Sequence, residues 1–242
     1  MLRMRAESTN SRSIWESVKR SLEANREAYG AIRAGLRTGM TERDAFALVA
    51  AAVDRVCGDE PHEFIGDFVG GVRTGSIEGP PTDYVFKAGD LFILDLSVRR
   101  GEVWSDTCRT FFLGEPTQRQ REAYAAVLAC QDEGVRTVRA GVVASSVRPP
   151  MIDVLAARGF GGLMPHHGGH LVGPEPYMKP AFEDGCDGIV EAGDVCTLEP
   201  GVYVPGEWGM RVENDYLVVA DGVENLFDYP RDIEYFIIGG CR

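Results

Sequence analysis

The sequence has no long apolar run and fewer basic than acidic side chains, and each shortage argues against a class of protein. No apolar stretch reaches the roughly 20 residues of a membrane-spanning helix, so we expect no membrane segment. The 37 acidic and 25 basic residues give a net charge of −12. Because phosphate contacts need Lys and Arg, this charge argues against nucleic-acid binding. It suits a site that holds cations.

The sequence also lacks the cysteine spacing of a disulfide framework and the start of a secreted protein. Its six cysteines include no C-x-x-C pair, which is typical of scattered thiols in a reducing compartment. Residues 1–13 are polar where a secretory signal would be apolar. We therefore expect a cytoplasmic protein.

The hydrophobic pattern predicts helices and strands in two similar halves. A chain of 242 residues that is 44% hydrophobic can bury a large core. In each half, two helices precede a hairpin that carries two acids, which favours one α+β domain made of two halves. The predicted helices lie at 11–37, 41–56, 117–139 and 145–158, and the predicted strands at 64–72, 91–98, 102–113, 195–203, 210–220 and 235–238.

The first hairpin is predicted to bring two carboxylates together. If Arg100 and Gly101 form the turn, Asp95 and Asp106 are directly opposed, with Cβ atoms roughly 4.5–5.5 Å apart. Such a pair needs a shared proton, an arginine or a metal ion. Asp106 alone is equally well explained as a solvated acid on an edge strand. Asp95 interrupts the apolar run 91–98, where an unpaired acid is costly.

The second hairpin and a histidine cluster extend this pattern. Glu199 and Glu213 are equidistant from a loop centred on Gly206, so they too are predicted to face each other. Three of the four histidines fall within five residues, and imidazoles beside carboxylates can bind a metal ion. His166 and His167, taken singly, are equally well explained as loop histidines; the cluster is His166, His167 and His170.

Four carboxylates and one imidazole suit two divalent cations roughly 3.5–4 Å apart. The mainly oxygen ligands favour Mn²⁺, Fe²⁺, Co²⁺ or Zn²⁺ and do not distinguish among them.

Together these residues resemble the pita-bread metallopeptidases, which include methionine aminopeptidase, aminopeptidase P, prolidase and creatinase-like enzymes. The resemblance extends from about residue 15 to residue 240. The segments that carry it are Asp95, Ser105–Thr110, His166-x-x-Gly169-His170-x-x-Gly173, Glu199-Pro200-Gly201-x-Tyr203 and Gly209–Glu213.

The resemblance implies an α+β pita-bread fold, with two pseudo-symmetric α+β halves around a curved antiparallel sheet. We expect residues 1–242 to form a single catalytic domain that includes the first helices, at 11–57, with no separate N-terminal creatinase-type domain. The proline-specific members commonly form dimers, so a homodimer is the expectation by analogy.

The resemblance also implies how two metal ions are held. Asp95 would bind one ion through both oxygens, and Asp106 and Glu213 would bridge the two ions. His170 and Glu199 would complete the second ion, and Glu199 would also act as general base for the bridging water.

Further roles follow from the same resemblance. Arg211 is similar to a family arginine that orients a ligand carboxylate. His166 matches a substrate-contacting histidine of the proline-specific members and is a candidate catalytic residue. His167 has no matched role.

The sequence departs from the family at two substrate-contacting histidines. One usually lies about 17 residues before the first metal-binding aspartate, where this sequence has Glu78. The other lies seven residues after the ligand histidine, where it has Tyr177. Tyr177 could donate a hydrogen bond or a proton to the substrate, and Glu78 could bind a cationic group. The alternative is that both simply line the cleft.

We therefore expect a dinuclear metal-dependent hydrolase resembling Xaa-Pro aminopeptidases and dipeptidases, in which a metal-bridging hydroxide attacks an amide carbonyl. One alternative is a specialised hydrolase or lyase with a small-molecule substrate on the same fold. Another is a non-catalytic binding module, which the complete set of five ligands disfavours.

Overall fold

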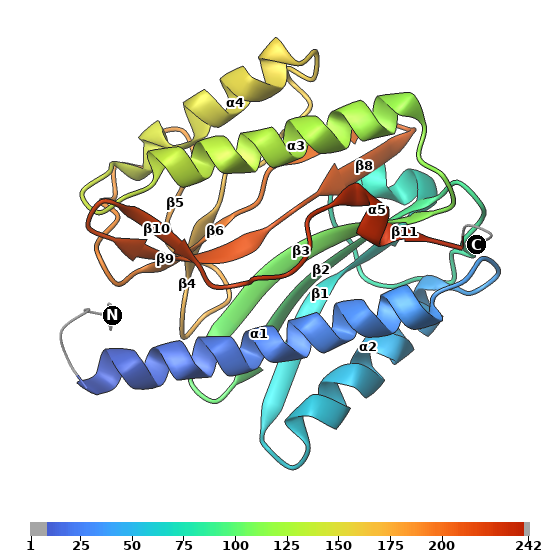
Figure 1. Cartoon of the computed structure of the whole chain (residues 1–242), viewed down its shortest axis with the longest axis horizontal. Coiled ribbons are helices and arrows are strands. Elements are labelled where there is room, and N and C mark those ends of the chain that lie inside the picture. Colours follow the sequence, from blue (N-terminus) through green and yellow to red (C-terminus); the bar gives the residue numbers. More distant parts are fainter. Residues whose placement is uncertain (1–8, 240–242) are drawn as a thin grey trace.

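The computed structural model describes residues 9–239, in which helices and strands follow one another in two similar halves (Figure 1). The first half contains α1 (Thr9–Gly35), α2 (Glu42–Cys57), β1 (His62–Gly70), the 3₁₀ helix η1 (Gly71–Ser76), β2 (Leu91–Arg100) and β3 (Trp104–Leu113). The second contains α3 (Gln118–Thr137), the 3₁₀ helix η2 (Ala144–Ser146), α4 (Arg148–Ala157), β4 (His170–Val172), β5 (Met178–Ala181), β6 (Val195–Leu198), β7 (Gly201–Val204), β8 (Trp208–Arg211), β9 (Asn214–Val219), β10 (Gly222–Asn225), α5 (Ile233–Phe236) and β11 (Ile237–Ile238).

The strands form three sheets, and helices cover them from two sides. One sheet has the order β1-β2-β3-β11, a second has the order β10-β9-β6-β4-β5, and β7 pairs with β8. In Figure 1, α1 and α2 lie on one side of the strands, and α3 and α4 lie on the other. An isolated bridge between Cys108 and Glu213 joins β3 to the β8–β9 segment. The two halves therefore meet where the predicted acids lie.

Local sequence sets the starts of two helices as predicted. Thr41 accepts a hydrogen bond from the backbone N–H of Asp44, whose carboxylate in turn accepts from the backbone of Thr41. Thr117 and Gln120 form the same capping box at α3. Each box satisfies N–H groups that the first helical turn leaves free.

Several short elements were missed or assigned differently. No strand was predicted at β4, β5 or β10, which are three or four residues long and lie in Gly- and Pro-rich sequence or directly after a turn. The predicted strand at 235–238 is instead the end of α5 followed by the two-residue β11. The terminal residues 1–8 and 240–242 of the predicted domain lie outside the described residues.

The predicted register of the first hairpin is wrong by two residues. Asp95 is opposed to Cys108, and Asp106 is opposed to Ser97. Strand β2 continues through Arg100, because the backbone N–H of Arg100 donates to Ser21 and its carbonyl accepts from Ser17, both on α1. Asp95 and Asp106 are therefore diagonal neighbours on one face of the sheet, within reach of each other but not directly paired.

Buried polar contacts fix α1 against the strands that carry these acids. Asn25 donates to the carbonyl of Leu96 and to the hydroxyl of Thr107, and it accepts from Ser105. The hydroxyl of Tyr29 donates to the carbonyl of Thr107 at 2.7 Å. Because these groups are buried, losing one partner would leave another unsatisfied.

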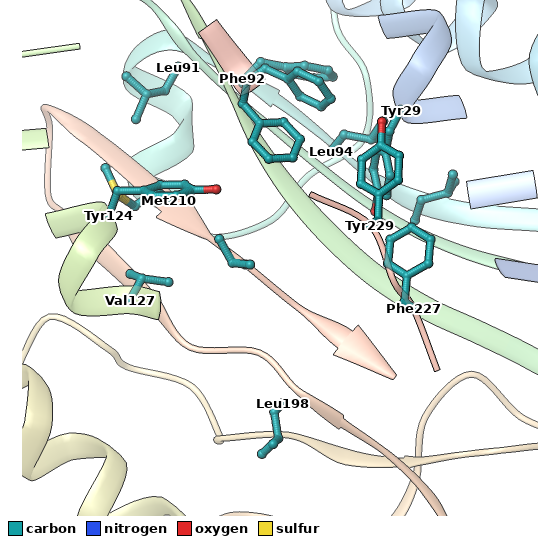
Figure 2. Close-up of a cluster of buried hydrophobic side chains, with 14 of the residues drawn as sticks. Tyr29, Leu91, Phe92, Leu94, Tyr124, Val127, Leu198, Met210, Phe227 and Tyr229 are labelled. Carbon is teal, nitrogen blue, oxygen red and sulfur yellow. The ribbon is translucent and has the colours of Figure 1, made fainter. Parts of the chain in front are cut away.

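One cluster of buried apolar side chains includes residues from both halves. Figure 2 shows part of it, including Tyr124 of α3, Met210 of β8, and Tyr29 of α1, whose ring lies beside that of Tyr229. The rings of Phe227 and Tyr229 are stacked, with centroids 5.2 Å apart. Within residues 9–239, no helix is both long and apolar enough to cross a membrane.

Candidate metal centre

Three of the predicted ligands converge where the two halves meet. The side chains of Asp106 on β3, His170 at the start of β4 and Glu213 between β8 and β9 are all buried. Each offers a ligand atom within 4.8 Å of the other two. Oxygen and imidazole donors at this spacing suit a divalent cation.

Glu199 joins these three through His170. The Nε2 atom of His170 lies 3.4 Å from Glu199 Oε1 and 3.6 Å from Asp106 Oδ2. Nδ1 of His170 lies 3.0 Å from the carbonyl oxygen of Leu171, which can only accept, so Nδ1 carries the proton. The Nε2 lone pair of the neutral ring therefore points at the two carboxylates, as a metal-ligating histidine requires.

The second hairpin has the predicted register around Glu199 and Glu213. Leu198 pairs with Asn214, and Gly201 pairs with Arg211. These pairs flank the two glutamates on both sides and place them at the same level of the hairpin. The sequence therefore predicted this register correctly, although Pro200 interrupts the strand between β6 and β7.

Arg211 holds the fifth predicted ligand, Asp95. Its Nε and Nη2 atoms lie 2.8 and 2.7 Å from Asp95 Oδ2. Nη1 donates to the hydroxyl of Tyr203 at 2.6 Å and to the carbonyl of Ile77 at 3.2 Å. This planar group fixes one carboxylate oxygen of Asp95, which is the contact that the predicted orienting role requires.

Burial and mutual repulsion make the carboxylates costly to ionise without a cation. Burial, and then the nearby Asp95, raises the pKa of Asp106 well above its usual range. Burial, followed by Asp106 and Asp95, does the same to the pKa of Glu213. The Oε2 atom of Glu213 is buried and has no hydrogen-bond partner among the described residues. An orphaned acceptor among buried acids fits a positively charged ligand, so this donor set suits divalent metal ions.

Glu199 behaves differently because imidazoles surround it. Burial favours its protonated form, but the contact with His167 lowers its pKa, which lies below the usual value. Its Oε1 also accepts a hydrogen bond from Thr197 at 2.9 Å. Glu199 is therefore ionised at neutral pH, as a proton acceptor must be.

The two neighbouring histidines have different surroundings. His166 is fully engaged, with Nδ1 2.8 Å from the carbonyl of His167 and Nε2 3.1 Å from the hydroxyl of Tyr203. Burial lowers the pKa of His166 to about 4. Nδ1 of His167 lies 3.4 Å from Glu199 Oε1. Burial lowers the pKa of His167, but Glu199 outweighs it, and the net shift is upward.

The two positions that depart from the family lie on different elements. The ring of Tyr177, 44% exposed, packs against His170 and His167 with centroids 4.6 and 5.5 Å away. Glu78 is exposed, in the loop before β2. Its neighbours Ile77 and Gly79 are tied to the centre, since Ile77 accepts from Arg211 and Gly79 donates to Asp67.

Sequence reasoning missed Asp67, which lies directly opposite Asp95 in the β1–β2 pair. Its Oδ2 lies 3.3 Å from Nη2 of Arg211. Burial, and then the charge of Asp95, raises the pKa of Asp67 to about 6. An isolated acid in the predicted strand at 64–72 was a sequence signal for a functional role, but only the register of β1 with β2 places it against Asp95.

Two further buried residues support the centre and were also missed. Asp215 accepts the backbone N–H of Asp106 at 2.9 Å, which fixes the backbone of that predicted ligand. Arg109 is fully buried and donates to the carbonyl of Glu213 and to the side chain of Asn214. Their partners are more than 100 residues away, so no local pattern indicates these roles.

Comparisons with known proteins identify the family of this chain. The model of metallopeptidase family M24 matches residues 16–220. An uncharacterised peptidase of Staphylococcus aureus strain MSSA476 is 29% identical over 196 residues, which is 81% of this chain and 56% of that protein. The chain thus spans about half the length of the curated relatives that it matches.

Solved structures show the same architecture. An X-Pro aminopeptidase from Thermotoga maritima has a TM-score of 0.88 and 27% identity, over 94% of this chain and 63% of that one. An Xaa-Pro dipeptidase from Bacillus anthracis has a TM-score of 0.88 and 26% identity, over 97% and 64%. A prolidase from Pyrococcus furiosus has a TM-score of 0.86 and 26% identity, over 94% and 66%. These matches confirm the predicted α+β pita-bread fold, and the protein belongs to metallopeptidase family M24.

Proposed function

We propose that the protein is a divalent-metal-dependent hydrolase that cleaves an amide bond, with Xaa-Pro peptides as the first substrates to test. The observation that carries the proposal is the convergence of buried carboxylates from both halves on the unprotonated Nε2 of His170. Membership of the M24 family and the likeness to Xaa-Pro peptidases support it.

The proposed ligands of two divalent cations, Mn²⁺, Co²⁺, Zn²⁺ or Fe²⁺, are Asp95, Asp106, His170, Glu199 and Glu213. When bound, such cations supply Lewis-acid activation of a carbonyl group and a water molecule of lowered pKa. Asp106 and Glu213 are the proposed bridging ligands, because both are buried and Asp106 raises the pKa of Glu213.

Glu199 would take the proton of the attacking water and pass it to the nitrogen of the broken C–N bond. Its carboxylate is ionised and Thr197 fixes Oε1, so the second carboxylate oxygen is left to accept the proton. Arg211 would keep Asp95 in position through two short contacts. Catalytic and substrate-binding roles for His166, Tyr177 and Glu78 remain predictions.

A small non-peptide amide is the second candidate substrate, and Tyr177 favours it. A half-exposed phenol packs against His170 where the resemblance leads us to expect an imidazole. A phenol has a reference pKa of about 10 and is a weaker acid than imidazolium at pH 7. It would suit a leaving group that needs less assistance from an acid.

A hydrolysis screen tests the function. The metal-stripped protein is reloaded with Mn²⁺, Co²⁺, Zn²⁺ or Fe²⁺ and offered proline dipeptides, ordinary dipeptides, N-acylated amino acids and guanidino acids. We expect turnover with at least one metal and none after chelation. Asp106→Ala should abolish turnover, and Asp221→Ala, which removes an exposed aspartate, should not. Full activity of Asp106→Ala would overturn the assignment.

A further inference from the structure

Nδ1 of His167 is buried and makes only one long contact, to Glu199, among the residues that the structure describes. This nitrogen atom is inaccessible to solvent and has no hydrogen-bond partner among residues 9–239. The nearest acceptor described for it is Glu199 Oε1, at 3.4 Å. N–H···O hydrogen bonds are normally about 2.7–3.2 Å long. A buried polar atom without a partner indicates a ligand that completes the site.

The same carboxylate oxygen lies equally far from His170. Its Nε2 atom and Glu199 Oε1 are also 3.4 Å apart. Two donors that each lie about 2.1 Å from one cation, at a tetrahedral angle, are about 3.4 Å from each other. Both imidazoles therefore have the spacing from Glu199 that two ligands of one cation show.

His166 does not offer a nitrogen in this way, although it also lies near Glu199. Its Nδ1 faces a carbonyl oxygen, which can only accept, so Nδ1 carries the proton. Nε2 of the neutral ring then accepts the hydroxyl proton of Tyr203, whose oxygen already accepts from Arg211. Both ring nitrogens of His166 are thus used inside the protein.

We propose that His167 is a further metal ligand, which binds through Nδ1 the cation that His170 and Glu199 hold. The inference rests on the proposed function, because it requires a metal centre. The ring of His167 packs against those of His170 and Tyr177, with centroids 5.4 and 5.5 Å away, so the position of His167 is fixed on two sides. A second imidazole makes the donor set richer in nitrogen, which favours Zn²⁺ or Co²⁺ over Mn²⁺.

A crystal structure of the zinc-loaded protein, with zinc located by anomalous scattering, tests this directly. We expect zinc about 2.0–2.1 Å from Nδ1 of His167. Zinc bound to the other ligands, with Nδ1 more than 3 Å away, would overturn the inference and leave the proposed function intact. Absence of zinc from the whole centre would overturn both.

Metal affinity in solution gives an independent measurement. Chelator competition is used to compare the native protein with His167→Phe, which keeps a ring against Tyr177 but has no nitrogen. We expect the Zn²⁺ dissociation constant to rise at least tenfold and the preference for Zn²⁺ over Mn²⁺ to fall. His62→Phe is the matched control, because His62 bonds to Glu60 and Asp54 away from the centre. An unchanged preference for Zn²⁺ in folded His167→Phe would contradict the inference.

Discussion

Replacing Glu213 with glutamine should stabilise the metal-free protein at pH 8 and remove most of its stabilisation by metal. Glu213 is 1% exposed, and Asp106, Asp95 and Glu199 all oppose its ionisation. Glutamine has nearly the same shape and no charge. The variant therefore removes repulsion in the metal-free protein and a ligand in the metal-bound protein.

The sign of the pH dependence follows from the raised pKa. The folded pKa of Glu213 lies well above the unfolded value of about 4.3. Between these values the folded state binds more protons, so the free energy of unfolding falls as the pH rises through this window. Each pKa unit of difference contributes about 1.4 kcal/mol, or roughly 3–6 °C in melting temperature for a chain of this size.

Metal binding changes the free energy of unfolding in the opposite direction to the charge repulsion, and by a similar amount. A cation present at 100 times its dissociation constant stabilises the folded protein by about 2.7 kcal/mol, which corresponds to roughly 5–11 °C. Glu213→Gln should lose most of this gain, because a neutral amide is a weaker ligand than a carboxylate and does not offset the cation's charge.

Melting curves from pH 4 to pH 8, with and without metal, test both terms. Metal-free native protein and Glu213→Gln should melt together near pH 4 and diverge as the pH rises, with the variant more stable. Glu224→Gln makes the same chemical change at an exposed glutamate and should follow the native curve. A metal-free Glu213→Gln that melts below the native protein at pH 8 would refute the claim that the buried charges repel.

Three further predictions concern the surroundings of the centre. Arg211→Lys should weaken metal binding about 10- to 100-fold in chelator competition, because lysine cannot replace both contacts to Asp95; unchanged affinity would rule out the orienting role. Tyr177→His should raise kcat/KM for ordinary dipeptides if the phenol redirects substrate choice, and no gain would contradict that idea. Glu42→Ala should cost about 3–5 kcal/mol in the free energy of unfolding, because it leaves the N–H groups of Gly70 and Thr82, and the partly buried guanidinium of Arg73, without the buried carboxylate that accepts from them; a urea melt within 1 kcal/mol of the native curve would disprove the structural role of Glu42.

The sequence predicted the long elements well because their signals are local. The capping boxes at Thr41 and Thr117 are visible in the sequence, and the helices begin there in the structure. The hairpin that carries Asp95 was placed two residues out of register, since contacts from α1 extend β2 through Arg100. Those contacts join residues about 80 positions apart, so a prediction based on the turn residues alone cannot include them.

The residues around the proposed ligands were harder to find in the sequence than the acids and the histidine proposed as ligands. Asp67 looks like an ordinary strand residue until the β1–β2 register sets it against Asp95. Arg109 was noted only as part of a motif, whereas the structure gives it the carbonyl of Glu213. Such partners lie in other elements and depend on how the sheets meet.

The contrast between His166 and His167 shows why ligand assignment needs three dimensions. In the sequence both are histidines of one Gly-rich segment, and the family resemblance gives a role only to His166. Whether an imidazole can bind a cation depends on where its lone pair points, and the partner of the other nitrogen decides that. Tyr203 comes from a strand more than 30 residues away, and it occupies the free nitrogen of His166. Nothing comparable occupies Nδ1 of His167 among the described residues, so the nitrogen beside Glu199 that is free to bind a metal belongs to the histidine without a matched role.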